Sequence, residues 1–501
     1  MRRGLWLAVV PLLVIGCSSA GGHSSAAREE NAGPARPKPT GWVRSDLTPL
    51  SSPQLAGGRL VLYTEGGGGI QVAGLDPLTG KTVWHEGASP GDTTGGVAPT
   101  LAVSGSTVAF LSAIDNSTGS SELVGVDAAT GRRLWHTSVG AFEDWPAPCP
   151  DAARDICTTG SLGSGQGTVA LRFRASDGVQ VGAVTIAQSG GGRSIGPDLY
   201  DPGVRSPEAM VAVSGDSVAW DNPLDSVFSQ GDSTDWGWSF IRVPAAGLFV
   251  GSVGGPPVST TATTGIISLA RDGTAGFRIS DGSVAWQDPG SWFACGQLPC
   301  PGQGLGDGIP TMGLRLRATG TVTNDISTGT LTMSPGGTVT LEGFDLATGK
   351  TIWSYDAGSD ADLLDQLPPV IGSEVIALPA KSGGDMVALN LATGKPAPVS
   401  PTAAGWCGSS VQYKTKVPYP KPGGGSQYER SAFSGYEPCD ASGNSAPFPA
   451  KVPSFAGVTV DGLTVTSDPS EVAATPTVPL SHRSSGASTG HVPIVRKKVS
   501  R

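Results

Sequence analysis

Six cysteines of this sequence fall into three local pairs and could form covalent cross-links. They are Cys149 with Cys157, Cys295 with Cys300, and Cys407 with Cys439. An even number of cysteines in an exported chain predicts three disulfides, and pairing of neighbours closes one short loop each, although nested pairings are possible in principle. Cys295 and Cys300 could also imitate a metal site, but zinc needs two more ligands and no histidine lies nearby in sequence.

Other side chains that could do chemistry are few. The body of the chain holds only His85 and His136, which follow equivalent tryptophans, so a histidine-based triad or zinc site lacks its usual groups. The run Gly87–Gly91 matches the pattern of a nucleophile elbow, but it lies in a Gly/Asp/Thr-rich stretch without the required helix. Acidic clusters at 221–235 and 356–365 do not have the spacing of an EF-hand. We therefore assign no catalytic residue and no metal ligand.

The N-terminal region predicts export. Arg2 and Arg3 precede an apolar run, 4–16, that is too short to be a stable membrane span. The run ends in Val-Ile-Gly-Cys, which resembles the bacterial lipobox, and this resemblance implies cleavage before Cys17 and lipidation of Cys17. The alternative is an ordinary secreted protein with a chance cysteine. We expect a signal peptide at 1–16 and a flexible lipidated tether at 17–41, because that stretch has no apolar period.

Composition limits the remaining possibilities. The 501 residues include 74 Gly and 41 Pro, which disfavour long helices. Charged residues make up 15% of the chain and the net charge is −9, so a nucleic-acid partner is not expected. The 38% of hydrophobic residues can form a large core. The composition therefore favours an all-β chain with many turns.

An internal repeat defines the expected fold. Four segments share a strand, an Asp or Asn, a Thr-Gly turn and a second strand that opens with Lys or Arg: 74–84, 125–135, 343–353 and 388–398. Weaker copies at 173–183, 240–251, 277–286 and 439–444 bring the turn glycines to Gly80, Gly131, Gly178, Gly247, Gly282, Gly349, Gly394 and Gly443. Further hairpins, such as 101–113 and 210–220, precede most turns. Four short strands in a period of about 52 residues predict a β-propeller.

The repeat unit resembles the tryptophan-docking repeat of the quinoprotein-like propellers. The residues that carry the resemblance are Asp76, Gly80, Trp84, Asp127, Gly131, Trp135, Trp286, Asp345, Gly349 and Trp353. It implies a propeller over residues 42–474, with eight blades favoured and seven as the alternative, and the strand at 457–467 could close the ring with the first blade. Residues 475–501 are expected to be a disordered basic tail.

Aromatic residues gather beside the cysteines and in a divergent insertion. They are Trp145, Trp236, Trp238, Trp292 and Trp406. Rigid aromatic loops are good binding surface, so these residues are a possible ligand face. The alternative is that each one caps its own blade.

The resembled family contains both pyrroloquinoline-quinone (PQQ) dehydrogenases and a non-enzymatic outer-membrane assembly lipoprotein. The dehydrogenases use adjacent cysteines against PQQ, together with Ca²⁺, and this sequence has no adjacent cysteines. We therefore expect no cofactor and a non-catalytic binding or scaffold module, monomeric and lipid-anchored at the outer face of the bacterial cell membrane. Its partner would be a protein or another cell-envelope ligand. The alternative is an exported oxidoreductase that uses PQQ and Ca²⁺.

Overall fold

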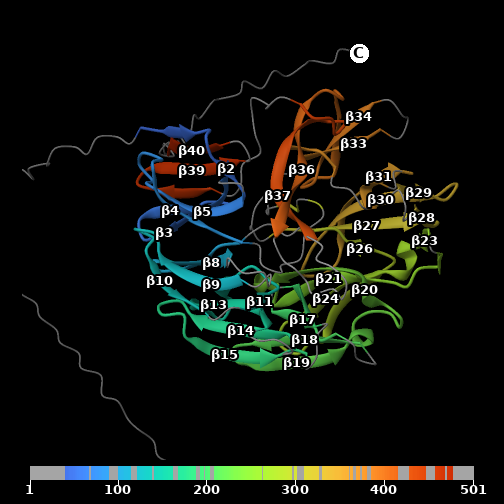
Figure 1. Ribbon diagram of the computed structural model, residues 1–501. Helices are drawn as coiled ribbons and strands as arrows, with labels where there is room; N and C mark the ends of the chain where they lie inside the picture. The colour runs from blue at the N-terminus through green and yellow to red at the C-terminus, as the bar shows by residue number, and fades with distance from the viewer. Residues whose placement is uncertain are drawn as a thin grey trace, which may run out of the picture. The chain divides into compact units, whose positions relative to one another are not determined.

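The computed structural model describes residues 40–477 with gaps (Figure 1). The gaps are 67–68, 90–99, 114–120, 138–139, 162–166, 188–191, 197, 204–207, 262, 296–297, 299, 302–309, 326–329, 360–361, 365–367, 373–374, 381–384, 416–427, 447–456 and 469–470. The signal peptide, Cys17 and most of the expected tether and tail therefore lie outside the described residues. Within the described ranges, no helix has the length and apolarity of a membrane span.

The described chain is a β-propeller built of antiparallel sheets, and the first four sheets follow one another along the chain. The first contains β2 (Thr48–Pro49), β3 (Gln54–Ala56), β4 (Arg59–Gly66), β5 (Gly69–Leu75) and β6 (Thr82–Gly87). The second contains β7 (Ala102–Ser104), β8 (Thr107–Ala113), β9 (Ser121–Asp127) and β10 (Arg133–His136). The third contains β11 (Ala141–Phe142), β12 (Ala147–Cys149), β13 (Ala152–Ser161), β14 (Val169–Arg174) and β15 (Gln180–Thr185). The fourth contains β16 (Arg193–Gly196), β17 (Leu199–Asp201), β18 (Ala209–Ser214) and β19 (Ser217–Pro223).

Two further sheets and an inserted one complete the middle of the chain. The fifth sheet contains β20 (Ser233–Val243), β21 (Leu248–Gly254), β24 (Gly273–Arg278) and β25 (Val284–Pro289). The sixth contains β26 (Trp292–Phe293), β27 (Gly313–Thr319), β30 (Thr338–Phe344) and β31 (Thr351–Gly358). Between them, β22 (Ser259–Thr260) and β23 (Thr264–Ile267) pair with β28 (Val322–Asp325) and β29 (Thr330–Met333). Short 3-10 turns occur at η1 (Leu224–Ser226), η2 (Pro244–Ala246), η3 (Leu269–Arg271) and η4 (Asp362–Leu364).

The seventh sheet carries a long hairpin on its first strand. Its order is β35-β34-β33-β32-β36-β37, with β32 (Val370–Gly372), β33 (Val375–Pro379), β34 (Met386–Asn390), β35 (Lys395–Val399), β36 (Ala404–Thr415) and β37 (Tyr428–Asp440). Figure 1 shows β36 and β37 on the side of this sheet that is opposite β34. Val370 of β32 pairs with Trp406 of β36, so the hairpin extends the sheet beyond its first strand.

The last sheet joins the two ends of the described chain. It contains β38 (Val458–Val460), β39 (Leu463–Asp468) and β40 (Glu471–Pro476), and β1 (Trp42–Arg44) pairs with β40 through Trp42 and Ala474. The sequence predicts that the segment 457–467 closes the ring with the first blade, whereas in the structure its sheet is completed by β1, which precedes the first sheet, through pairing with β40. A strand from each end in one sheet keeps the edge strands paired and resists opening of the propeller.

At five junctions, a tryptophan of one sheet contacts the next sheet. The indole Nε1 donates a hydrogen bond to a carbonyl oxygen of the following sheet, and the bonds are Trp42 to Pro77 (2.9 Å), Trp84 to Ala128 (2.7 Å), Trp135 to Ala175 (2.8 Å), Trp220 to Ile279 (2.9 Å) and Trp286 to Leu346 (3.2 Å). Each ring also covers the turn glycine of that sheet. A Cβ at Gly131, for example, would meet the ring of Trp84. These glycines have positive φ, which other residues rarely adopt.

The Asp and Thr of the repeat stabilise its turns. In the turn of the second sheet, Asp127 Oδ1 accepts hydrogen bonds from the Thr130 amide (3.0 Å) and the Thr130 hydroxyl (2.7 Å). Asp76 with Thr79 and Asp345 with Thr348 make the same pair of contacts. Such side-chain contacts stabilise a turn conformation locally, which explains the spacing of the repeat.

Two of the glycines predicted at repeat turns, Gly247 and Gly443, lie elsewhere in the fold. Gly247 lies between β20 and β21, the first hairpin of the fifth sheet, and Gly443 follows β37. The sequence predicts that the hairpin at 210–220 is a strand pair upstream of a repeat turn. It is instead the last hairpin of the fourth sheet, and its Trp220 occupies the docking position. All these turns need a residue with positive φ, so glycine alone does not distinguish them.

Candidate functional site

The junction between the third and fourth sheets lacks a docking tryptophan. In the repeat, the tryptophan stands four residues after the turn glycine, as in Gly131 and Trp135. The corresponding residue after Gly178 is Gly182, in β15. Gly182 lines a cavity of about 170 Å³. The place that a side chain at Gly182 would take is occupied by Asp216 and Arg172, because an added Cβ would meet Asp216 Oδ1 at 2.2 Å and Arg172 Cβ at 3.3 Å. This site was not predicted from the sequence, although the repeat at 173–183 visibly lacks the tryptophan.

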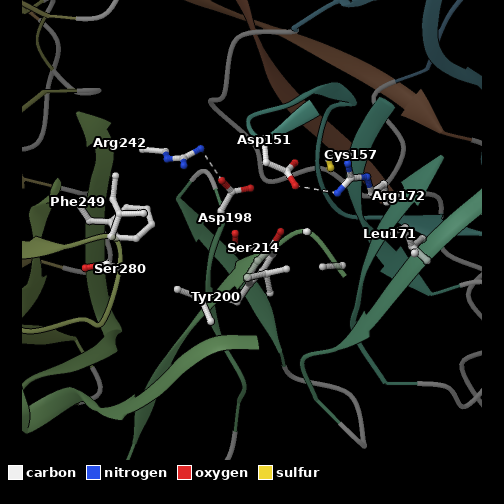
Figure 2. Close-up of a pocket in the computed structure, with 17 residues that line it drawn as sticks. Asp151, Cys157, Leu171, Arg172, Asp198, Tyr200, Ser214, Arg242, Phe249 and Ser280 are labelled. Atoms are coloured by element: carbon white, nitrogen blue, oxygen red, sulfur yellow. Dashed lines mark hydrogen bonds and ion pairs between the residues drawn. The ribbon is translucent and has the colours of Figure 1, made fainter. Parts of the chain in front are cut away.

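The cavity takes residues from three successive sheets (Figure 2). Its apolar wall includes Ala170, Leu171, Ala212, Val213, Phe249 and Ile279, and its polar lining includes Asp151, Arg172, Asp198, Tyr200, Ser214, Arg242 and Ser280. Figure 2 shows Arg242 reaching Asp198 and Arg172 reaching Asp151. Cys157 also lines the cavity, and its disulfide to Cys149 fixes the loop that carries Asp151.

Arg172 is shared by several carboxylates. Its Nε lies 2.9 Å from Asp155 Oδ2, and its Nη1 lies 2.9 Å from Asp151 Oδ2 and 3.9 Å from Asp216 Oδ1. One positive charge faces three negative charges here. Because the Arg172 side chain is mostly buried, this imbalance is less screened than at an open surface.

Asp198 forms the opposite charged pair of the cavity. Its Oδ2 lies 2.8 Å from Arg242 Nη1. Burial raises the pKa of Asp198 to about 6, Arg242 opposes the rise, and the negative charge of Asp151 adds to it. Asp198 also has a φ of 62°, which is uncommon for a residue other than glycine. The two Arg–Asp pairs together make a polar cavity with an excess of negative charge.

Two tryptophans of the expected ligand face, Trp145 and Trp406, are buried. Trp145 is 6% exposed and its ring contacts Tyr63 in a T-shaped arrangement at 5.4 Å. Trp406 is 0% exposed. Both rings lie in the interior: Trp145 packs with the core of the first two sheets, and Trp406 lies within β36, where it pairs with Val370 of β32. They therefore do not present a surface to a ligand.

The other three tryptophans of the expected ligand face are Trp236, Trp238 and Trp292. Trp238 is half-buried, with the guanidinium of Arg193 4.4 Å from its ring centroid. Trp292 is half-buried against the core of the sixth sheet. The side chain of Trp236 lies outside the described residues. The structure does not gather these tryptophans around the cavity, since none of them lines it.

The family model described as outer membrane protein assembly factor BamB matches residues 36–228 and 312–413. Together these ranges cover more than half of the chain. The chain belongs to this family. Its PQQ-type repeat is the one that carries the tryptophan contacts and Asp–Thr turns described above. No curated protein matches the chain significantly.

Solved structures with a similar arrangement have low sequence identity. BamB from Moraxella catarrhalis is 13% identical over 85% of this chain and 99% of its own, with a TM-score of 0.27. A europium-containing methanol dehydrogenase is 11% identical over 74% of this chain and 84% of its own, with a TM-score of 0.32. Quinohemoprotein alcohol dehydrogenase from Comamonas testosteroni is 13% identical over 84% of this chain and 78% of its own, with a TM-score of 0.30. Such scores carry no argument about function.

The three expected disulfides are confirmed. Cα–Cα distances are 5.0 Å for Cys149–Cys157, 5.4 Å for Cys295–Cys300 and 5.8 Å for Cys407–Cys439. The last bond joins β36 to β37 near the base of their hairpin. These cysteines are therefore committed to covalent cross-links in this member of the BamB-like family.

The cysteines and the acidic residues can be compared with the PQQ and Ca²⁺ sites that the resemblance to quinoprotein dehydrogenases implies. No two cysteines are adjacent in sequence, and six of the seven are in disulfides between separated positions. Among the described residues, no group of three or more His, Cys, Asp or Glu side chains could hold a metal ion. Calcium prefers six to eight oxygen ligands, several of them carboxylates.

A buried carboxyl outside the cavity should make stability depend on pH. Asp272 follows η3, is 8% exposed, and accepts a hydrogen bond from the Gly255 amide at 2.7 Å. Burial raises its pKa to about 7, Gly255 lowers it in part, and the charge of Asp232 raises it further. Because folding disfavours the ionised form, this contribution to stability is full below the ordinary pKa and is lost as pH rises through 7.

Replacing Asp272 with asparagine should therefore stabilise the protein at pH 8 by roughly 1–3 kcal/mol and have little effect at pH 4, since each unit of pKa shift corresponds to about 1.4 kcal/mol. The asparagine oxygen can still accept the Gly255 hydrogen bond. Thermal melts of both proteins between pH 4 and pH 8 measure the difference. Asp281→Asn is the exposed control. Equal changes at both pH values would contradict the expected titration.

Proposed function

We propose that this chain is an exported, lipid-anchored protein whose propeller acts as a non-catalytic binding or scaffold module in the cell envelope. The observation that carries the proposal is the cavity at Gly182, which offers fixed charged groups and an apolar wall to a ligand. Its described lining contains no histidine, and its one cysteine, Cys157, is in a disulfide. The Arg–Asp pairs and the apolar wall of this cavity are groups that could recognise a ligand.

An exported oxidoreductase is the alternative function. Its support is the PQQ-type repeat, which dehydrogenases also contain. Against it stand the disulfides, which leave no adjacent cysteine pair, and the described residues, which offer no calcium-binding set. Fold alone does not determine function, so we base the choice on these residues.

The proposed location depends on the N-terminal sequence. Cys17 and its lipobox-like context would place a lipid at the start of the tether, and the tether would hold the propeller at the outer face of the membrane. The matching family is described as an outer membrane protein assembly factor, and this description favours a protein partner in the envelope.

In-cell crosslinking and pull-down of the tagged full chain would test this function. We expect a stoichiometric protein partner, and we expect Cys17→Ala to move the chain from the membrane fraction to the soluble exported fraction. Ser18→Ala is the matched control, which should stay at the membrane. Recovery of no protein partner would overturn the proposal, and binding of PQQ with Ca²⁺ in a thermal-shift assay would support the oxidoreductase instead.

A further inference from the structure

We propose that the cavity at Gly182 binds the alkylammonium side chain of a lysine presented by the partner protein. This inference rests on the proposed binding function and names the chemistry that its site recognises. It follows from the shape left by Gly182, from the charge of the lining and from the position of Arg242.

The shape fits an unbranched apolar stem. At neighbouring junctions the corresponding space is filled by an indole, as Trp135 does between the second and third sheets. At Gly182 the indole is missing, and the cavity beside it has an apolar wall that includes Leu171, Val213 and Ile279. A lysine can place its methylene groups along such a wall and keep its charge at the polar end.

The charge fits an ammonium group. Asp151 and Asp198 both line the cavity, and the negative charge of Asp151 contributes to the raised pKa of Asp198. Arg172 is already shared with Asp155, so it does not neutralise Asp151 alone. A cation between the two carboxylates would reduce their repulsion, and an ammonium brings three hydrogen-bond donors.

An additional donor favours a lysine within a peptide over a free amine. Arg242 lines the cavity, and its Nε is buried without a hydrogen-bond partner in the described part of the chain. A buried donor without an acceptor is costly, and a peptide carbonyl next to the lysine could accept this hydrogen bond. Pentylamine has an ammonium but no carbonyl, so it provides a direct comparison.

Calorimetric titration of the detergent-solubilised full chain would test the site. The probes are Nα-acetyl-lysine N-methylamide, its neutral norleucine analogue and pentylamine. We expect the lysine amide to bind at least tenfold more tightly than either of the others. Gly182→Trp should abolish binding, because a Cβ at this position would meet Asp216 Oδ1 at 2.2 Å and Arg172 Cβ at 3.3 Å, so the indole would displace Arg172 from the cavity lining. Gly87→Trp, where an added Cβ would meet no atom within 4 Å, should leave binding unchanged.

A second variant keeps the test decisive if Gly182→Trp does not fold. Asp198→Asn should weaken binding of the lysine amide at least tenfold, while Asp46→Asn, which removes an exposed carboxylate paired with Arg44, should not. Equal affinities for lysine and norleucine amides, or no binding of either to the native chain, would overturn the inference. Equal binding of pentylamine would overturn recognition of a peptide lysine and indicate a free amine.

The pull-down separates failure of this inference from failure of the proposed function. A partner that is recovered equally by the native chain and by folded Asp198→Asn would leave the binding module standing and reject the cavity as its contact. Binding should also weaken at pH 5, because Asp198, which faces Arg242, Asp151 and Tyr200, becomes protonated as pH falls below 6. A pH-independent affinity would count against Asp198 as the recognising group.

Discussion

Replacement of Arg315 by methionine should lower the free energy of unfolding by about 3–5 kcal/mol, because it removes a buried guanidinium from two half-buried carboxylates and leaves them only the partly exposed Arg317. Arg315 lies in β27 and is 2% exposed. Its guanidinium lies 2.9 Å from Asp288 Oδ2 in the fifth sheet and 2.7 Å from Glu342 Oε2 in the sixth. It also donates to the Thr351 hydroxyl at 2.7 Å and lies 4.8 Å from the ring centroid of Phe344.

A double-mutant cycle separates the lost charge pair from the lost volume. Arg317 also contacts Asp288 and Glu342, but it is partly exposed and can neutralise only one of them fully. Adding Glu342→Gln to Arg315→Met should therefore recover part of the loss in urea denaturation. Arg174→Met, at an exposed pair with Asp177, should cost less than about 1 kcal/mol. A loss at Arg315 no greater than the loss at Arg174 would show that the pair network adds no stability.

The repeat units were predictable because the residues that define each unit lie close together in the sequence. An Asp, a Thr three residues later, a glycine and a tryptophan act within one hairpin and its neighbour, so their spacing survives in the sequence. Gly247 and Gly443 were misassigned because they share only the glycine. Neither has the Thr before it or the tryptophan four residues after it. Apart from the inserted sheet, the described residues form eight sheets, and from this we propose eight blades.

Long-range features were not predictable from the sequence. The inserted sheet pairs Thr264 with Asp325, which are distant in sequence, and no local pattern marks this pairing. The burial of Trp145 and Trp406 likewise depends on how irregular segments fold onto neighbouring strands. The cavity is an intermediate case. The repeat shows that glycine, Gly182, replaces the tryptophan beside the cavity. The residues that line the cavity, however, come from three sheets, and their meeting cannot be read from the sequence.

Removal of the Trp135 indole should have a similarly large effect, with a loss of about 3–5 kcal/mol for Trp135→Ala. The ring is largely buried, covers Gly125 of its own sheet and Gly178 of the next, and donates to the Ala175 carbonyl at 2.8 Å. The substitution therefore opens a cavity and leaves a buried carbonyl without its donor. Trp135→Phe should lose less, because it keeps most of the apolar contact.

The neighbouring residue provides the matched control for this prediction. Leu134 lies on the same strand, β10, but its side chain is exposed, so Leu134→Ala should change the free energy of unfolding by no more than about 0.5 kcal/mol. Urea denaturation of the three variants measures the difference. Similar losses for Trp135→Ala and Leu134→Ala would mean that the indole does not hold the sheets together. A large loss at Trp135 together with retained binding of the lysine amide would show that the Gly182 junction tolerates its missing indole because the Arg–Asp pairs stabilise it instead.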